Sequence, residues 1–327
     1  MISLELEWEQ YLTDCDPLAA VDPELRPTLA VMPDLDQLSH ATLPAIRTML
    51  QGTPVTLGAT GSVTVSRVAI PSMDGAAAVS ALLYQPLNGS GVPVPALLNI
   101  HGGGFVAGSA QREHAAMCIL ASELGCVVLS PDYRLAPEFP FPAALEDCRT
   151  SLAWLYREAA ALNIDDHRIA ARGVSAGGGL ALGLALQMRD DNAPSVCFLS
   201  LVYPMLDDRT GPHSVAGRYV WTANANRFGW DSYLGGQNRS SPSFYAVPGR
   251  ATDFAGMPSI FLAVGAIDLF AAETLSLAIK LIDAGVPTEL HIYPGAYHGF
   301  NLVANSRATH AFIRDSGAAF KRALSLG

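Results

Sequence analysis

The sequence predicts an α/β protein with a mostly parallel central sheet covered by helices on both faces. Short apolar runs rich in Val, Ile and Leu alternate with longer stretches whose apolar residues recur at helical spacing. This alternation is typical of a parallel sheet whose crossover helices pack on its two faces. Half of the 327 residues are hydrophobic and only 15% are charged, so the chain can bury a large core.

The regular alternation begins near residue 63, after a proline-interrupted stretch of short helices in residues 1–55. The expected strands are Val63–Ile70, Ala76–Tyr84, Val94–Ile100, Cys126–Ser130, Ile169–Val174, Val196–Tyr203, Ser259–Val264 and Thr288–Tyr293. The expected helices are Ala143–Ala160, Ala176–Arg189, Arg307–Leu326 and one that ends near Gly285, with Leu275, Ala278, Ile279 and Ile282 on its apolar face.

Residues 205–255 interrupt the alternation. They are rich in Gly, Pro and Asn and contain the aromatic residues Trp221, Phe228, Trp230 and Tyr233. We expect an insertion above the carboxyl edge of the sheet, where α/β folds bind their ligands. The domain organisation predicted is a catalytic domain of residues 56–204 and 256–327, with a helical cap formed by residues 1–55 and 205–255.

Gly173–Gly177 reads Gly-Val-Ser-Ala-Gly and joins a β-branched strand to an Ala-rich helix. This G-x-S-x-G pattern is typical of a sharp turn that exposes a nucleophilic serine, here Ser175, at the start of a helix. The flanking glycines leave room for the turn, and the helix N-terminus faces developing negative charge. The alternative is a Gly-rich turn that Ser175 merely caps.

His101–Gly104 reads His-Gly-Gly-Gly and follows the strand Val94–Ile100 directly. Glycines let backbone N–H groups approach a tetrahedral oxyanion closely, and this motif forms the oxyanion loop of lipases and esterases. The expected donors are Gly103, Gly104 and Ala176. A phosphate-binding loop is a weaker interpretation because the lysine that such a loop requires is missing.

With these motifs the chain resembles the hormone-sensitive-lipase-like esterases, the bacterial HGGG group (family IV) of the α/β-hydrolase superfamily. Further matching segments are Asp132–Glu138, Phe141–Ala144 and Tyr297–Phe300, and the resemblance spans about residues 60–325. It implies the α/β-hydrolase fold, an esterase activity and a homodimer. One departure is Val174, because the family usually has Asp or Thr before the nucleophile.

Chain order and placement predict the acid and the base. The fold runs Ser, then Asp or Glu, then His. Asp268 and His298 follow strands near the carboxyl edge of the sheet, so we expect both beside Ser175.

Other acids and bases fit less well. His291 lies inside a strand, where a structural or surface role is expected, and His310 lies in the last helix, where solvent exposure is expected. Asp132 and Asp147 precede the serine in the chain, and Glu273 is a fallback acid.

These residues predict a carboxylic ester hydrolase that cleaves short-to-medium acyl esters through an acyl-enzyme intermediate. The alternatives are an amidase, a lactonase or a ligand-binding protein. The last is considered because the plant gibberellin receptor resembles this family but lacks the histidine. Phe105, Trp221 and Phe228 are expected to line the substrate pocket, as are Trp230 and Tyr233. Core packing is the alternative for the four aromatic residues of the cap. No cofactor or metal is expected, since neither an HExxH motif nor a CxxC pair is present.

The formal net charge of −10 disfavours nucleic acid and anionic membrane surfaces as partners, leaving a small-molecule ester as the expected ligand. The first residues are acidic and no apolar run is long enough to span a membrane, so a cytoplasmic location is expected. The five cysteines, an odd number, are expected to be buried free thiols.

Overall fold

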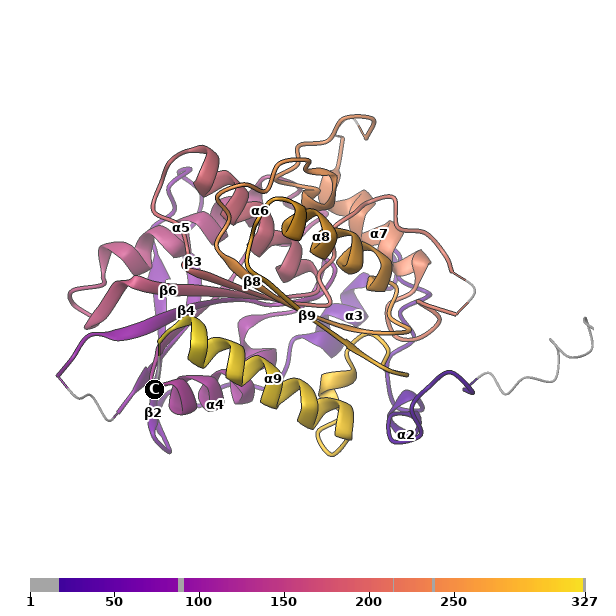
Figure 1. Cartoon of the computed structure of the whole chain (residues 1–327), viewed down its shortest axis with the longest axis horizontal. Helices are drawn as coiled ribbons and strands as arrows, with labels where there is room; N and C mark the ends of the chain where they lie inside the picture. The colour runs from indigo at the N-terminus through magenta and orange to yellow at the C-terminus, as the bar shows by residue number, and fades with distance from the viewer. Residues whose placement is uncertain (1–17, 88–90, 214, 237–238, 326–327) are drawn as a thin grey trace, which may run out of the picture.

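The protein, a computed structural model that describes residues 18–87, 91–213, 215–236 and 239–325, is built on one sheet of nine strands (Figure 1). Their order is β1-β2-β3-β5-β4-β6-β7-β8-β9. The first four strands in that order pair antiparallel and the rest pair parallel. The bounds are β1 Gly58–Thr60, β2 Val63–Ile70, β3 Val79–Pro86, β4 Val94–Ile100, β5 Val127–Asp132, β6 Ile164–Val174, β7 Phe198–Val202, β8 Ser259–Gly265 and β9 Thr288–Tyr293.

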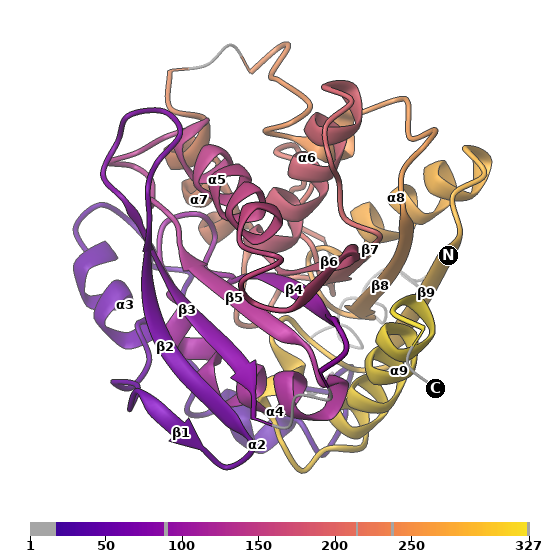
Figure 2. The ribbon, with the colours of Figure 1, turned by 90° about the vertical axis from the view of Figure 1, so that its left-hand side faces the viewer.

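Helices cover both faces of this sheet (Figure 2). Helices α4 and α9 lie on one face, and α5, α6 and α8 lie on the other (Figure 1). The bounds are α2 Arg26–Leu29, α3 Leu43–Leu50, α4 His114–Leu124, α5 Ala143–Arg157, α6 Ala176–Asp190, α7 Ala223–Leu234, α8 Ala271–Asp283 and α9 Arg307–Ala323, with 3₁₀ turns η1 Ala110–Glu113, η2 Pro248–Arg250 and η3 Phe300–Leu302. The predicted fold class, an α/β-hydrolase fold, is confirmed.

Some observed strand bounds differ from the predicted ones, because the strands pair with partners that are distant in the sequence. Strand β3 begins at Val79 rather than Ala76 and continues to Pro86, which pairs with Val63 of β2. Strand β6 begins at Ile164, because that residue pairs with Val94 of β4. Neither partner is adjacent in the sequence, so local hydrophobic patterns do not reveal these ends.

The predicted apolar face of α8 is wrong at three of its four residues, and only Ala278 is buried as expected. The structure buries Thr274, Leu277, Ala278 and Leu281 against the sheet and exposes 40% of Leu275, 59% of Ile279 and 62% of Ile282. Two overlapping rows of apolar residues have helical spacing in this segment. Packing against β8 and β9 selects the row that includes Leu277, which the sequence pattern alone cannot do.

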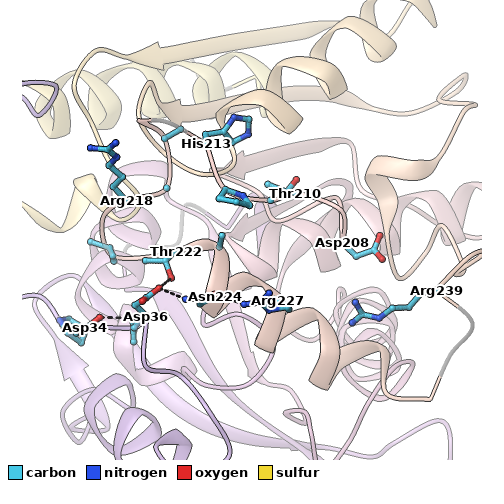
Figure 3. Close-up of a pocket in the computed structure, with 18 residues that line it drawn as sticks. Asp34, Asp36, Asp208, Thr210, His213, Arg218, Thr222, Asn224, Arg227 and Arg239 are labelled. Atoms are coloured by element: carbon cyan, nitrogen blue, oxygen red, sulfur yellow. Dashed lines mark hydrogen bonds between the residues drawn. The ribbon is translucent and has the colours of Figure 1, made fainter. Parts of the chain in front are cut away.

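The N-terminal segment and the insertion after β7 contact each other at one end of the sheet. Asp36 accepts hydrogen bonds from Thr222 Oγ1 at 2.7 Å and Asn224 Nδ2 at 3.1 Å (Figure 3). The rings of His40 and Phe228 meet edge to face with centroids 5.1 Å apart. The two segments assigned to a cap therefore share one interface, while the exact domain boundaries stay a prediction.

Two further expectations concern cysteines and membranes. Cys126 and Cys148 are buried, Cys118 and Cys197 are half-buried, and all four are free thiols, while Cys15 lies outside the described residues. In the part of the chain that the structure describes, no helix is long and apolar enough to cross a membrane.

Candidate active site

The candidate nucleophile stands on a strained turn between β6 and α6. Ser175 has φ 55° and ψ −118°, a conformation that is rare for a non-glycine residue and is typical of functional sites. Its N–H donates to Val202 O at 2.9 Å, which ties the turn to the neighbouring strand β7. A Cβ at Gly177 would lie 2.1 Å from Ile100 O, so only glycine lets α6 approach the end of β4 this closely.

The His-Gly-Gly-Gly loop follows β4 and lies beside this turn. A Cβ at Gly102 would lie 3.3 Å from Ser175 Cβ. Gly103 and Gly104 both have positive φ, at 127° and 61°. Among the described residues, the N–H groups of Gly103, Gly104 and Ala176 have no hydrogen-bond partner, as an oxyanion hole requires.

His101, the first residue of that loop, holds the loop rather than taking part in chemistry. Its ring stacks on Tyr133 with centroids 4.2 Å apart, and Tyr133 Oη donates to His101 O at 3.0 Å. Burial lowers the pKa of His101. A neutral, stacked ring of this kind fixes the direction of the glycines that follow.

Asp268 and His298 form a hydrogen-bonded pair at the carboxyl edge of the sheet. Asp268 Oδ2 lies 2.9 Å from His298 Nδ1, and Asp268 Oδ1 accepts from Phe270 N at 2.9 Å. Both residues are buried. The loops that carry them are joined by a bond from Ile267 N to Ala296 O at 3.1 Å. This arrangement fixes the tautomer of His298 with Nε2 as its free nitrogen.

Aromatic rings that the sequence analysis did not single out for this role hold His298 in place. Tyr203, just after β7, packs on the imidazole with centroids 4.5 Å apart, and Phe270 meets it edge to face at 5.3 Å. Tyr203 Oη also donates to Asn301 Oδ1 at 2.7 Å. The sequence could have indicated Tyr203, because this residue stands at the end of a strand at the carboxyl edge of the sheet.

Ser175 Oγ and His298 Nε2 share no hydrogen bond within the described residues. Catalytic hydrogen bonds are often long or poorly aligned in unliganded enzymes and tighten when substrate binds. Ser175 and His298 are both buried, with 4% and 7% of each residue exposed, so the site is nearly closed to solvent in this structure.

The alternative acids and bases are engaged elsewhere. Asp132 accepts from Ala110 N at 2.7 Å, and Asp147 accepts from Arg134, with its closest contact at 2.7 Å. Glu273 accepts from Leu206 N at 2.7 Å and does not bond a histidine.

The two histidines considered as alternative bases do not contact Asp268. His291 contacts Glu289 and Asp315 at 2.8 and 3.4 Å. His310 is exposed on α9.

Of the residues expected to line the pocket, Trp221 contacts the candidate site. Its ring centroid lies 6.2 Å from that of His298. Phe105 is instead buried in an aromatic cluster, stacked on Tyr233 at 4.0 Å, and Phe228 packs on His40. Trp230 and Tyr233 are fully buried core residues as well.

In the described residues, no group of three or more His, Cys, Asp or Glu could hold a metal ion.

The fold thus carries a serine on a strained turn, an acid–histidine pair and backbone N–H groups without a partner. Residues 97–302 match the family described as having the alpha/beta hydrolase fold, and the chain belongs to that family.

Relatives place the chain among esterases. The chain is 29% identical over 338 residues to Carboxylesterase NlhH of Mycobacterium tuberculosis, which covers 91% of this chain and 98% of that protein. Esterase LipI of the same organism is 33% identical over 209 residues, and the chain spans 65% of its length. The solved structure of a bacterial heroin esterase superposes with a TM-score of 0.86 at 35% identity, covering 94% of this chain and 99% of that one.

These similarities confirm the resemblance to hormone-sensitive-lipase-like esterases and the expected enzyme class, a carboxylesterase.

Proposed function

We propose that this carboxylesterase cleaves short-to-medium acyl esters, with Ser175 as nucleophile, His298 as general base and Asp268 as its partner. The main support for the proposal is the 2.9 Å contact between the buried Asp268 carboxylate and His298 Nδ1. Ser175 occupies a strained turn at the same edge of the sheet.

The reaction proceeds in two acyl transfers. Nε2 of His298 takes the proton of Ser175 Oγ as that oxygen attacks the ester carbonyl, and the N–H groups of Gly103, Gly104 and Ala176 stabilise the oxyanion. His298 then protonates the leaving alcohol, so the C–O bond breaks and an acyl-enzyme remains. Water, activated by the same histidine, repeats the attack and releases the acid.

Ser175→Ala tests the proposal. We expect kcat for p-nitrophenyl butyrate to fall by about 10⁴- to 10⁶-fold, because the covalent route disappears. Circular dichroism serves as the folding control, and a fluorophosphonate reagent followed by mass spectrometry identifies the labelled serine. Near-normal activity in a folded Ser175→Ala variant would exclude the assignment.

An amidase or lactonase would use the same residues, since the fold hosts many chemistries. Matched esters and amides of one acyl group, together with a lactone, separate these reactions. We expect the ester to be the fastest substrate. A binding protein on this fold would turn over none of them.

A further inference from the structure

A cavity of about 720 Å³ lies outside the closed active site, between the N-terminal segment and the insertion (Figure 3). Val220 and Thr222 line this cavity, whereas Ser175, Asp268 and His298 do not. Its volume is within the range of small-molecule sites.

Trp221 stands between these two lining residues and turns its indole inward, with an exposed fraction of 3%. The indole rests directly on the oxyanion loop, because a Cβ at Gly104 would lie 2.1 Å from Trp221 Cη2. It also lies beside His298. The indole therefore separates the outer cavity from the groups proposed to act on the ester.

The backbone before this indole is strained. Val220 has φ 62°, in the left-handed region that β-branched residues avoid. Such conformations persist only where the surroundings hold them and are frequent at ligand clamps. Neighbouring contacts must therefore hold the backbone beside Trp221 in place.

Buried hydrogen bonds supply that restraint. Trp221 Nε1 donates to Asn226 Oδ1 at 3.4 Å, and Asn226 Nδ2 donates to Thr210 O at 3.0 Å. The Thr210 hydroxyl bonds the carboxyl group of Glu273, which also accepts from Leu206 N. Asn226 and Glu273 are both buried, and Thr210 between them lines the outer cavity, so the chain of bonds connects the indole to α8 along the wall of that cavity.

We propose that Trp221 is a specificity-determining residue that limits the size of the acyl group beside Gly104, and that Asn226 and Glu273 are positioning residues that hold its indole over the site. The proposal rests on the proposed esterase function. Small acyl groups fit beneath the indole, whereas a branched acyl group requires the indole to move away.

The first test compares kcat/KM for p-nitrophenyl acetate and p-nitrophenyl pivalate in the wild type, Trp221→Ala and Trp221→Leu. We expect the pivalate-to-acetate ratio to rise about tenfold or more in Trp221→Ala, which is the scale of one or two methylene groups in a pocket, and by less in Trp221→Leu. Phe244→Ala, which removes an exposed aromatic residue of the same insertion, should leave the ratio unchanged.

The second test addresses the positioning residues. Asn226→Ala and Glu273→Ala should shift the ratio in the same direction, and neither should shift it further in a Trp221→Ala background, because contacting residues are coupled. Glu273→Gln keeps an acceptor for Leu206 N and should restore the wild-type ratio. A merely destabilising role would lower both rates together and leave the ratio unchanged.

A ratio within twofold of the wild type in both Trp221 variants would overturn the proposal. If Asn226→Ala shifted the pivalate-to-acetate ratio equally in the wild type and in the Trp221→Ala background, the positioning role would be overturned. The proposed function fails by a different result, namely no hydrolysis of either ester by the wild type or full activity in Ser175→Ala.

Discussion

At the residue scale, the Asp268 carboxylate uses both of its oxygens, one toward His298 and one toward the N–H of Phe270. The backbone bond fixes the carboxylate plane, so the second oxygen is aimed at Nδ1. A charged oxygen at that position both selects the tautomer and stabilises the imidazolium that forms during acyl transfer.

Asp268→Asn should lower kcat by about 10²- to 10⁴-fold, because an amide neither stabilises the cation nor enforces the tautomer. Steady-state kinetics with a short-chain p-nitrophenyl ester measures this loss. Glu273→Gln is the matched control and should cost far less. A larger loss in Glu273→Gln than in Asp268→Asn would identify Glu273 as the acid.

Glu273 should also make stability depend on pH. Burial raises its pKa well above the ordinary value of 4.5, so the folded protein holds a proton that the unfolded chain releases. The stability that this proton contributes is complete below pH 4.5 and is lost as the pH rises toward the raised pKa. The free energy of unfolding of the wild type should therefore fall, relative to Glu273→Gln, between pH 5 and pH 8.

Urea unfolding of both proteins at the two pH values measures this difference. Equal stability differences at pH 5 and pH 8 would contradict a raised pKa for Glu273.

At the scale of elements, α6 begins directly at the nucleophile and carries glycines where it meets the sheet. The N-terminus of α6 faces the oxyanion region, so its approach to β4 sets the position of the Ala176 N–H. Glycine has a low helix propensity, but the close contact of α6 with the sheet requires glycine at these positions.

Gly177→Ala and Gly317→Ala should have opposite effects on stability. At Gly177 the added methyl group meets the backbone oxygens of Ile100 and His101, so we expect a loss of about 1–3 kcal/mol. At Gly317 in α9 an added Cβ would meet no atom within 4 Å beyond its chain neighbours and its own helix backbone, so alanine should stabilise the helix by about 0.5–1 kcal/mol. Thermal unfolding followed by circular dichroism measures both, and destabilisation of similar size in both variants would contradict this explanation.

At the scale of the whole molecule, the two segments predicted to form a cap contact each other and the loop region after β4. The 18–55 segment bonds the insertion through Asp36. Arg47 of the same segment donates from Nε to Val106 O at 2.7 Å, two residues after the His-Gly-Gly-Gly loop. The homodimer expected from the family resemblance stays a prediction, which the molar mass in solution tests.

A closed site of limited volume should give an optimum in acyl length. Each methylene that fits contributes about 0.8 kcal/mol of burial, and the first that does not fit reverses the gain. We expect kcat/KM for p-nitrophenyl esters to peak at about four to six acyl carbons and then fall steeply. Efficient hydrolysis of long-chain triglyceride emulsions, with a rate increase at the interface, would contradict this expectation.

The sequence alone determined the fold class, the turn at Ser175, the glycine loop and the strand ends that carry Asp268 and His298. These features are local, because a glycine pattern or a residue after a strand is visible within a few positions. The edge of a parallel sheet then brings the strand ends together. The roles of these residues remain for the variants above to test.

Only the tertiary structure decided which face of α8 is buried, which aromatic residues meet His298 and how Trp221 is held. Phe105 and Trp221 are both aromatic residues of the expected pocket, yet one packs into the core and the other covers Gly104. The bond between Glu273 and Thr210 joins positions 63 residues apart. Such contacts depend on how separate elements pack, and local sequence patterns carry no record of that packing.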